Sequence, residues 1–125
     1  MILRAINEEC DPHKIERPTL EDVTRAVERL DGKTQTLVTL EVSDGHHMAV
    51  GGGGGRYIVY IKFDNMQFKN LITPGKGGPT VILKCGGQES DFAPKQCVDL
   101  ETAGTAAETF ALTGQPDPEL TWEDG

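Results

Sequence analysis

The sequence predicts an α+β domain in which an antiparallel meander sheet of about five to six strands carries an N-terminal and a C-terminal helix. Apolar residues alternate with period two in several successive segments. Short turn pairs, Asp44-Gly45 and Asp64-Asn65, join neighbouring segments of this kind. A helical stripe of apolar residues stands towards each end of the chain. Strands joined by two-residue turns are antiparallel, so the sheet is expected to be a meander.

The first helix is expected to start after Thr19, which is a good N-cap residue. Apolar residues then fall on one face, and Glu21 can pair with Arg25 one turn later on the outer face. The apolar stripe is made of Leu20, Val23, Val27 and Leu30. Asp31-Gly32 is expected to end the helix.

Strands are expected at 1–9, 34–43, 46–50, 56–63, 66–72 and 80–85. In the strand 56–63, alternate residues from Tyr57 face one side, and Ile58, Tyr60 and Lys62 face the other. The polar segment 89–96 is expected to be a connection because it is polar and contains a proline. Residues 97–100 form either a last short strand or the entry to the second helix.

The second helix is expected over residues 101–113, with small alanines and Phe110 on its apolar face and Gly114 as its C-terminal stop. The tail, 115–125, carries the single tryptophan, Trp122. Its ring either folds back to cap the core or stands out as an anchor for a partner.

A chain of 125 residues suits a single domain over 1–125. Its apolar runs are far shorter than the ~20 residues that a membrane-spanning helix needs, and the N-terminus lacks the features of a signal peptide. Cys10, Cys85 and Cys97 are odd in number and widely spaced, which suits a reducing compartment. We therefore expect a cytoplasmic protein that does not enter the membrane.

Charge is unevenly distributed along the chain. The sequence has 12 basic and 20 acidic residues, a net charge of −8. Residues 96–125 contain seven of the acids and no Lys or Arg, whereas residues 1–95 are nearly neutral. An acidic surface repels nucleic acid and attracts basic partners, so nucleic acid is not an expected partner. Alternatively, the acids only confer solubility.

Five consecutive glycines, Gly51 to Gly55, precede Arg56. A phosphate-binding loop would need a following Gly-Lys-Ser/Thr and a helix, and a dinucleotide fingerprint would need another glycine at position 56. Neither pattern is present. We expect a wide bulge or a flexible connection between two paired strands. An alternative function is a small-molecule-binding or enzymatic domain that uses this run as a lid over a ligand.

The reactive residue types form no recognisable catalytic or metal motif. His46 and His47 are adjacent in a predicted strand, so their side chains point to opposite faces and cannot share a metal ion. Cys85 lies in an apolar strand and is expected to pack rather than react. The sequence therefore predicts a protein that is not an enzyme and holds neither a metal nor a cofactor.

Three segments together resemble the immunity proteins of bacterial polymorphic toxin systems, the deaminase-associated immunity family (immunity family one). They are GGGGGRYIVY at 51–60, GGQ at 86–88 and AAETFALTGQPDPELTWED at 106–124. The residues that carry the pattern are Gly53, Gly54, Gly55, Arg56, Tyr57, Gly86, Gly87, Phe110, Gly114, Pro118, Leu120 and Trp122. The resemblance spans about residues 19 to 124.

This resemblance implies a small cytoplasmic protein that binds a toxin domain and blocks its active site. The toxin is expected to be a deaminase acting on nucleic-acid bases, whose cleft must carry basic groups to hold a polyanion. Acidic residues near the loop and in the C-terminal region are therefore the candidate contacts. They are Glu89, Asp91, Asp117, Glu119, Glu123 and Asp124. A third possibility is an adaptor domain of a larger assembly.

Overall fold

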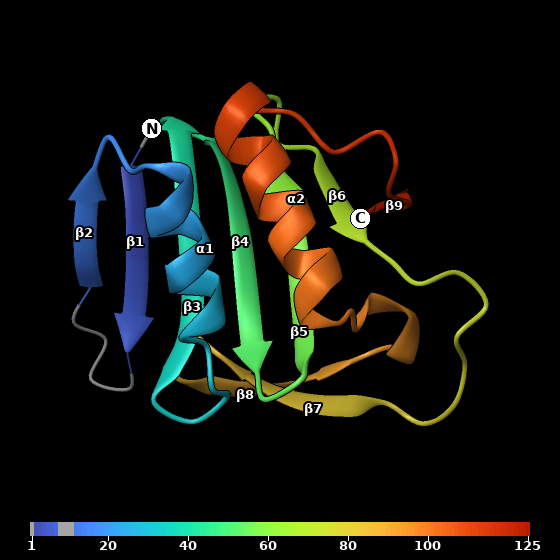
Figure 1. Ribbon diagram of the computed structural model, residues 1–125. Helices are drawn as coiled ribbons and strands as arrows, with labels where there is room; N and C mark the ends of the chain where they lie inside the picture. Colours follow the sequence, from blue (N-terminus) through green and yellow to red (C-terminus); the bar gives the residue numbers. More distant parts are fainter. Residues whose placement is uncertain (1, 8–11) are drawn as a thin grey trace.

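The computed structural model describes residues 2–7 and 12–125. Its main element is a seven-stranded antiparallel sheet in the order β2-β1-β3-β4-β5-β6-β9, and β7 and β8 form a separate hairpin. In chain order the elements are β1 (Ile2–Asn7), β2 (Pro12–Glu16), α1 (Leu20–Glu28), β3 (Gln35–Ser43), β4 (His46–Gly53), β5 (Arg56–Lys62), β6 (Phe68–Leu71), β7 (Val81–Cys85), β8 (Gln88–Phe92), the 3₁₀ turn η1 (Pro94–Gln96), α2 (Leu100–Thr113) and β9 (Trp122–Asp124). Both helices cross the same face of the sheet, and the hairpin lies by the end where β4 turns into β5 (Figure 1).

The predicted α+β class is confirmed, with a meander from β3 to β6 and one helix from each end of the chain packed on it. The sheet is wider than expected because β2 and β9 add a strand at each edge, whereas the strand expected at 80–85 lies outside it, as β7 of the separate hairpin. The segment 89–96 was expected to be a connection, and this is wrong for its first half, because β8 pairs with β7 along its whole length. Residues 97–100 combine both expected roles, since Val98 bridges to Tyr57 and Asp99 caps α2.

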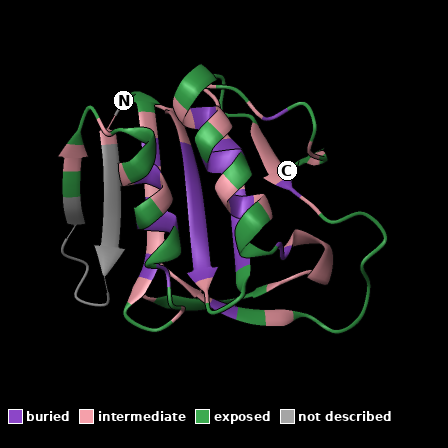
Figure 2. Cartoon of the chain, in the orientation of Figure 1, coloured by how far each residue is buried: buried purple, intermediate pink, exposed green. Residues whose placement is uncertain are grey.

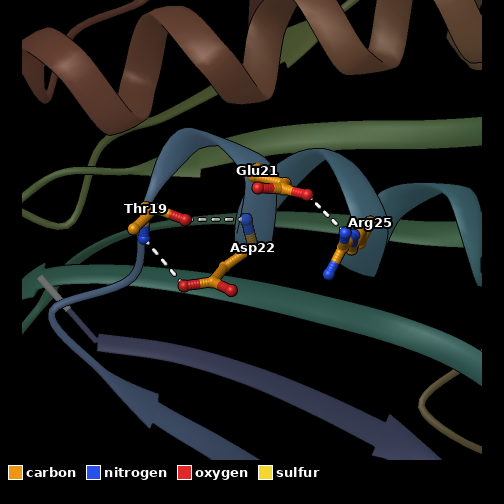
Figure 3. A network of polar contacts seen from close by, with 4 residues as sticks. All are labelled: Thr19, Glu21, Asp22 and Arg25. Carbon is orange, nitrogen blue, oxygen red and sulfur yellow. Dashed lines mark hydrogen bonds and ion pairs between the residues drawn. The ribbon is translucent and has the colours of Figure 1, made fainter.

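Helix α1 begins where the sequence predicts. The Thr19 hydroxyl accepts a hydrogen bond of 3.1 Å from the Asp22 N–H, and the Asp22 carboxylate accepts one of 2.9 Å from the Thr19 N–H (Figure 3). This reciprocal capping box satisfies two backbone donors that would otherwise lack partners. The predicted ion pair between Glu21 and Arg25 is present on the exposed side. Local sequence signals therefore define this helix start.

The main core lies between the two helices and the sheet. The helices contribute the buried residues Val23, Ala26, Val27, Ala103, Ala106, Ala107 and Phe110. The sheet contributes Val38, Leu40, Met48, Val50, Tyr57, Val59, Ile61 and Leu71. Figure 2 shows this burial along β4 and on the inner sides of the helices. Small alanines let α2 approach the sheet closely, and Phe110, with no exposed surface, is its large apolar anchor.

A second and smaller cluster lies on the opposite face of the sheet. Its buried members are Ile58 of β5, Leu83 of β7 and Cys97. Tyr60 and Phe92 are among the half-buried residues that pack against them. The alternation along β5 places its odd-numbered residues towards the helices and its even-numbered residues towards the hairpin. We call this second side the hairpin face of the sheet.

The glycine run forms neither a bulge nor a flexible connection, and that prediction is wrong. Strand β4 stays in register with β5 through Gly53, opposite Arg56, and Gly54 and Gly55 form the tight turn. Both turn glycines have positive φ values, 67° and 98°, as a two-residue hairpin turn requires. A lid over a ligand would need a longer free loop, so the geometry does not support the alternative based on a glycine lid.

Two glycines inside β4 allow other segments to come very close. A Cβ atom on Gly53 would stand 2.6 Å from the backbone nitrogen of Asp31, and Gly53 bridges to Asp31 in the turn after α1. A Cβ atom on Gly51 would stand 2.7 Å from the Cys85 Sγ on β7. The glycines are thus contact points for the α1–β3 turn on one side and for the hairpin on the other.

Candidate binding surface

Two of the six predicted acidic residues lie on the hairpin. Strand β8 directs Phe92 towards the second cluster, so the alternation points Glu89 and Asp91 away from the sheet. Both are exposed. Their cross-strand partners on β7 are Lys84 and Ile82, and Ile82 is 62% exposed. The outer side of the hairpin therefore combines acidic and apolar groups with one lysine, Lys84, opposite Glu89.

Two further acids lie on the edge strand β9, where lysines pair with them. The Glu123 carboxylate is 2.8 Å from the Lys95 Nζ of η1, and the Asp124 carboxylate is 2.9 Å from the Lys69 Nζ of β6. Because β9 adds to β6, these pairs join segments far apart in the sequence. Glu119 is exposed in the turn before β9. The structure thus places the six candidates in two groups, at the hairpin and at the C-terminal edge.

Asp117 differs from the other candidates because it is only 7% exposed. One carboxylate oxygen accepts a 2.7 Å hydrogen bond from the Thr109 hydroxyl, and the other accepts a 2.8 Å bond from the Glu119 N–H. Its backbone oxygen accepts a bond of 3.0 Å from the Trp122 indole N–H. These bonds tie the tail to α2. Asp117 therefore serves to hold neighbouring residues in place and presents little surface to a partner.

Several residues that carry the family resemblance pack against the core, cap a helix or form a turn. Trp122 is half-buried and packs with Leu120 against the main core. This favours a ring that caps the core over one that stands out as an anchor for a partner. Gly114 caps α2, and its N–H donates to the Phe110 carbonyl at 2.7 Å. Gly86 and Gly87 turn β7 into β8, where the Gly87 N–H donates to the buried Thr36 hydroxyl at 2.9 Å. This bond fixes the hairpin to β3.

The hairpin face carries a row of aromatic rings that the sequence reasoning missed. The His47 and Tyr60 ring centroids are 5.9 Å apart, and those of Tyr60 and Phe68 are 5.8 Å apart. The three rings come from β4, β5 and β6 and are all half-buried. We call these residues the aromatic row. The alternation of Tyr60 along its strand was the available signal, but it does not reveal which face stays open.

A pocket of about 220 Å³ lies beside the aromatic row. Its lining includes Leu37, Ile58, Tyr60, Asn70, Cys85 and Phe92. The pocket therefore lies between the sheet and the inner side of the hairpin, and most of its wall is apolar. Asn70 supplies a polar group at the β6 side.

Burial controls the protonation of the groups around this pocket. It raises the pKa of the Cys85 thiol to about 11, so the sulfur stays protonated near neutral pH and is a poor nucleophile. Burial and the nearby charge of Lys62 lower the pKa of His47, although Glu41 opposes them. Burial also raises the pKa of Tyr60. Near neutral pH all three groups are therefore uncharged.

His46 and His47 face opposite sides of the sheet, as predicted. The His46 ring contacts Phe63 and Phe110 on the helix side, at centroid distances of 5.3 and 5.6 Å. Within residues 2–7 and 12–125, no three His, Cys, Asp or Glu side chains gather as metal ligands would. Over the same ranges, no helix is long and apolar enough to cross a bilayer. Cys10 lies outside the described residues.

The fold is that of a small α+β domain with a well-packed helix side and a partly open hairpin face. The chain belongs to the Imm1 family of immunity proteins, whose family model matches residues 11–124. This confirms the resemblance over most of the chain. The protein is thus an immunity protein, and its partner is a cognate toxin. A comparison with curated proteins finds no match.

Proposed function

We propose that the protein neutralises its toxin by covering the active site, and that this toxin is a deaminase of nucleic-acid bases. The observation that carries the proposal is the match to an immunity family over residues 11–124. The deaminase follows from the resemblance to immunity proteins found beside such toxins. A deaminase cleft must hold a polyanion, and a protein of net charge −8 is attracted to such a basic cleft.

The proposed contacts are the exposed acids of the two groups, namely Glu89, Asp91, Glu119, Glu123 and Asp124. Glu89 and Asp91 are the leading pair, because they project from the hairpin. Glu123 and Asp124 already pair with lysines, so a basic toxin residue must compete for them and gains less. Asp117 contributes indirectly by holding the tail. The protein acts in the cytoplasm as a stoichiometric inhibitor and performs no catalysis of its own.

The test uses the toxin domain encoded beside the gene. The two proteins are co-expressed and purified, and base deamination is measured on single- and double-stranded DNA and on RNA while the inhibitor is titrated. We expect deamination to fall to background at about one equivalent of inhibitor, as tight one-to-one blockage requires. A toxin that binds the protein but deaminates none of these substrates would disprove the deaminase assignment alone. If the two proteins do not bind, the proposed function as a whole is wrong.

The electrostatic part is tested by charge reversal. Glu89→Lys combined with Asp91→Lys should weaken toxin binding by about tenfold or more and flatten its salt dependence, because attraction becomes repulsion. The matched control is Glu28→Lys combined with Glu101→Lys, which changes the net charge equally at exposed positions on the helices. Titration calorimetry at several salt concentrations measures both. Equal losses in the two variants would contradict the assignment of Glu89 and Asp91 as the leading contacts.

A further inference from the structure

The aromatic row and the pocket beside it form a surface unlike the helix side. Interface centres are enriched in aromatic residues and depleted of charge, and the row places three rings from adjacent strands in contact. Charged residues, Glu41 and Lys62, stand opposite His47 at one end of the row. The outer faces of the helices carry exposed charged residues such as Glu21 and Glu28. The hairpin packs on β3 and β4, yet Tyr60 and Phe68 remain only half-buried.

The size of the pocket indicates what can enter it. Its volume of about 220 Å³ is below the ~300–1,000 Å³ typical of sites for small molecules and cofactors. A single large side chain of a partner protein suits such a space, as at the anchored centres of many protein interfaces. The wall formed by Ile58, Leu37 and Phe92 favours an aromatic or long aliphatic group. Asn70 can bond to a polar tip.

We propose that the toxin docks on the hairpin face and inserts one large apolar side chain into this pocket. The inference rests on the proposed function, because it assigns a place to the same toxin. One acid lies on the same side of the sheet as the pocket: Glu123 pairs in register with the lining residue Asn70. Asp91 stands on the outer side of the hairpin, where it can meet only a part of the toxin that reaches around the hairpin. A basic toxin residue beside the inserted side chain can therefore contact Glu123, in competition with Lys95.

Photocrosslinking tests the location with a substitution that keeps an aromatic ring at the site. A photoreactive phenylalanine analogue, p-benzoylphenylalanine, replaces Phe68 on the hairpin face in one variant and Leu112 in the other. Leu112 is 70% exposed on α2 and serves as the matched position on the helix side. We expect a crosslink to the neighbouring toxin domain from position 68 and none from position 112. A crosslink from position 112 alone would overturn the inference.

Affinity provides the second measurement. Tyr60→Ala should weaken toxin binding by about thirty-fold, the effect of removing a hot-spot side chain, while Leu112→Ala should change it less than about twofold. Urea denaturation shows whether each variant remains folded. If Tyr60→Ala does not fold, the crosslinking result alone decides whether the toxin docks on the hairpin face. Wild-type protein that fails to bind the toxin refutes the proposed function, whereas wild-type binding with unchanged affinity in folded Tyr60→Ala refutes only the docking site.

Discussion

The two faces of the main sheet are built differently. On the helix face, Phe110, Leu40 and Ile61 are almost wholly buried among many apolar neighbours. On the hairpin face the buried hydrophobic cluster is small, with Ile58, Leu83 and Cys97 as its members, and the aromatic row stays partly open. A strand such as β5 supplies both faces through its alternation. We therefore expect the helix face to supply most of the stability, while the hairpin face is available for contact with a partner.

The largest expected effect compares one core residue from each face. Phe110→Ala should lower the free energy of unfolding by about 4 kcal/mol, because it empties the centre of the main core. Leu83→Ala should cost about 2 kcal/mol, because its cluster is small and the hairpin can settle into the space. Urea denaturation followed by circular dichroism measures both. A Leu83→Ala loss equal to or above that of Phe110→Ala would contradict the unequal division of stability.

A smaller effect concerns how closely the hairpin sits on the sheet. Gly51→Ala should destabilise the protein by about 2 kcal/mol through overpacking, because the new Cβ would stand 2.7 Å from the Cys85 Sγ. Cys85→Ala removes that sulfur, so Gly51→Ala should cost roughly half as much in this background. The double-mutant cycle is measured by urea denaturation. Additive losses would mean that the hairpin does not rest on Gly51.

Elements with local signals were predictable from the sequence. Thr19 and Gly114 fix helix ends through contacts within a few residues, and alternating apolar residues identify β3 and β5. Strand β8 was missed because its residues are polar except Phe92, and its pairing with β7 stabilises it. Strand β9 was missed because three residues are too few to show a period. Its existence depends on β6, about fifty residues earlier.

The candidate surface was predictable only in part. Charge identified Glu89 and Asp91 as exposed acids, since acidic residues are rarely buried. It also selected Asp117, which is buried because Thr109 and a backbone N–H satisfy its carboxylate. No local pattern distinguishes these cases. The aromatic row could not be predicted from the sequence, because its exposure depends on which part of the sheet the hairpin packs against.

The smallest expected effect is a gain in stability on the helix face. Gly104 lies within α2, and a Cβ atom there would have no heavy atom within 4 Å. Gly104→Ala should therefore raise the free energy of unfolding by about 1 kcal/mol, because alanine favours the helix and restricts the unfolded chain. The melting temperature should rise by about 4 °C for a domain of this size.

Gly104→Ala also tests whether the helix face supplies stability while the hairpin face binds the toxin. Gly104 lines a groove of about 250 Å³ between α1 and α2, beside Glu28, Glu101 and Glu108. If the toxin docks on the hairpin face, the added methyl group stabilises the protein and leaves toxin affinity unchanged. If affinity falls while stability rises, the groove between the helices is the contact site, because the methyl group narrows it without loosening the fold. Calorimetry with the toxin domain and thermal denaturation of the same samples separate the two results.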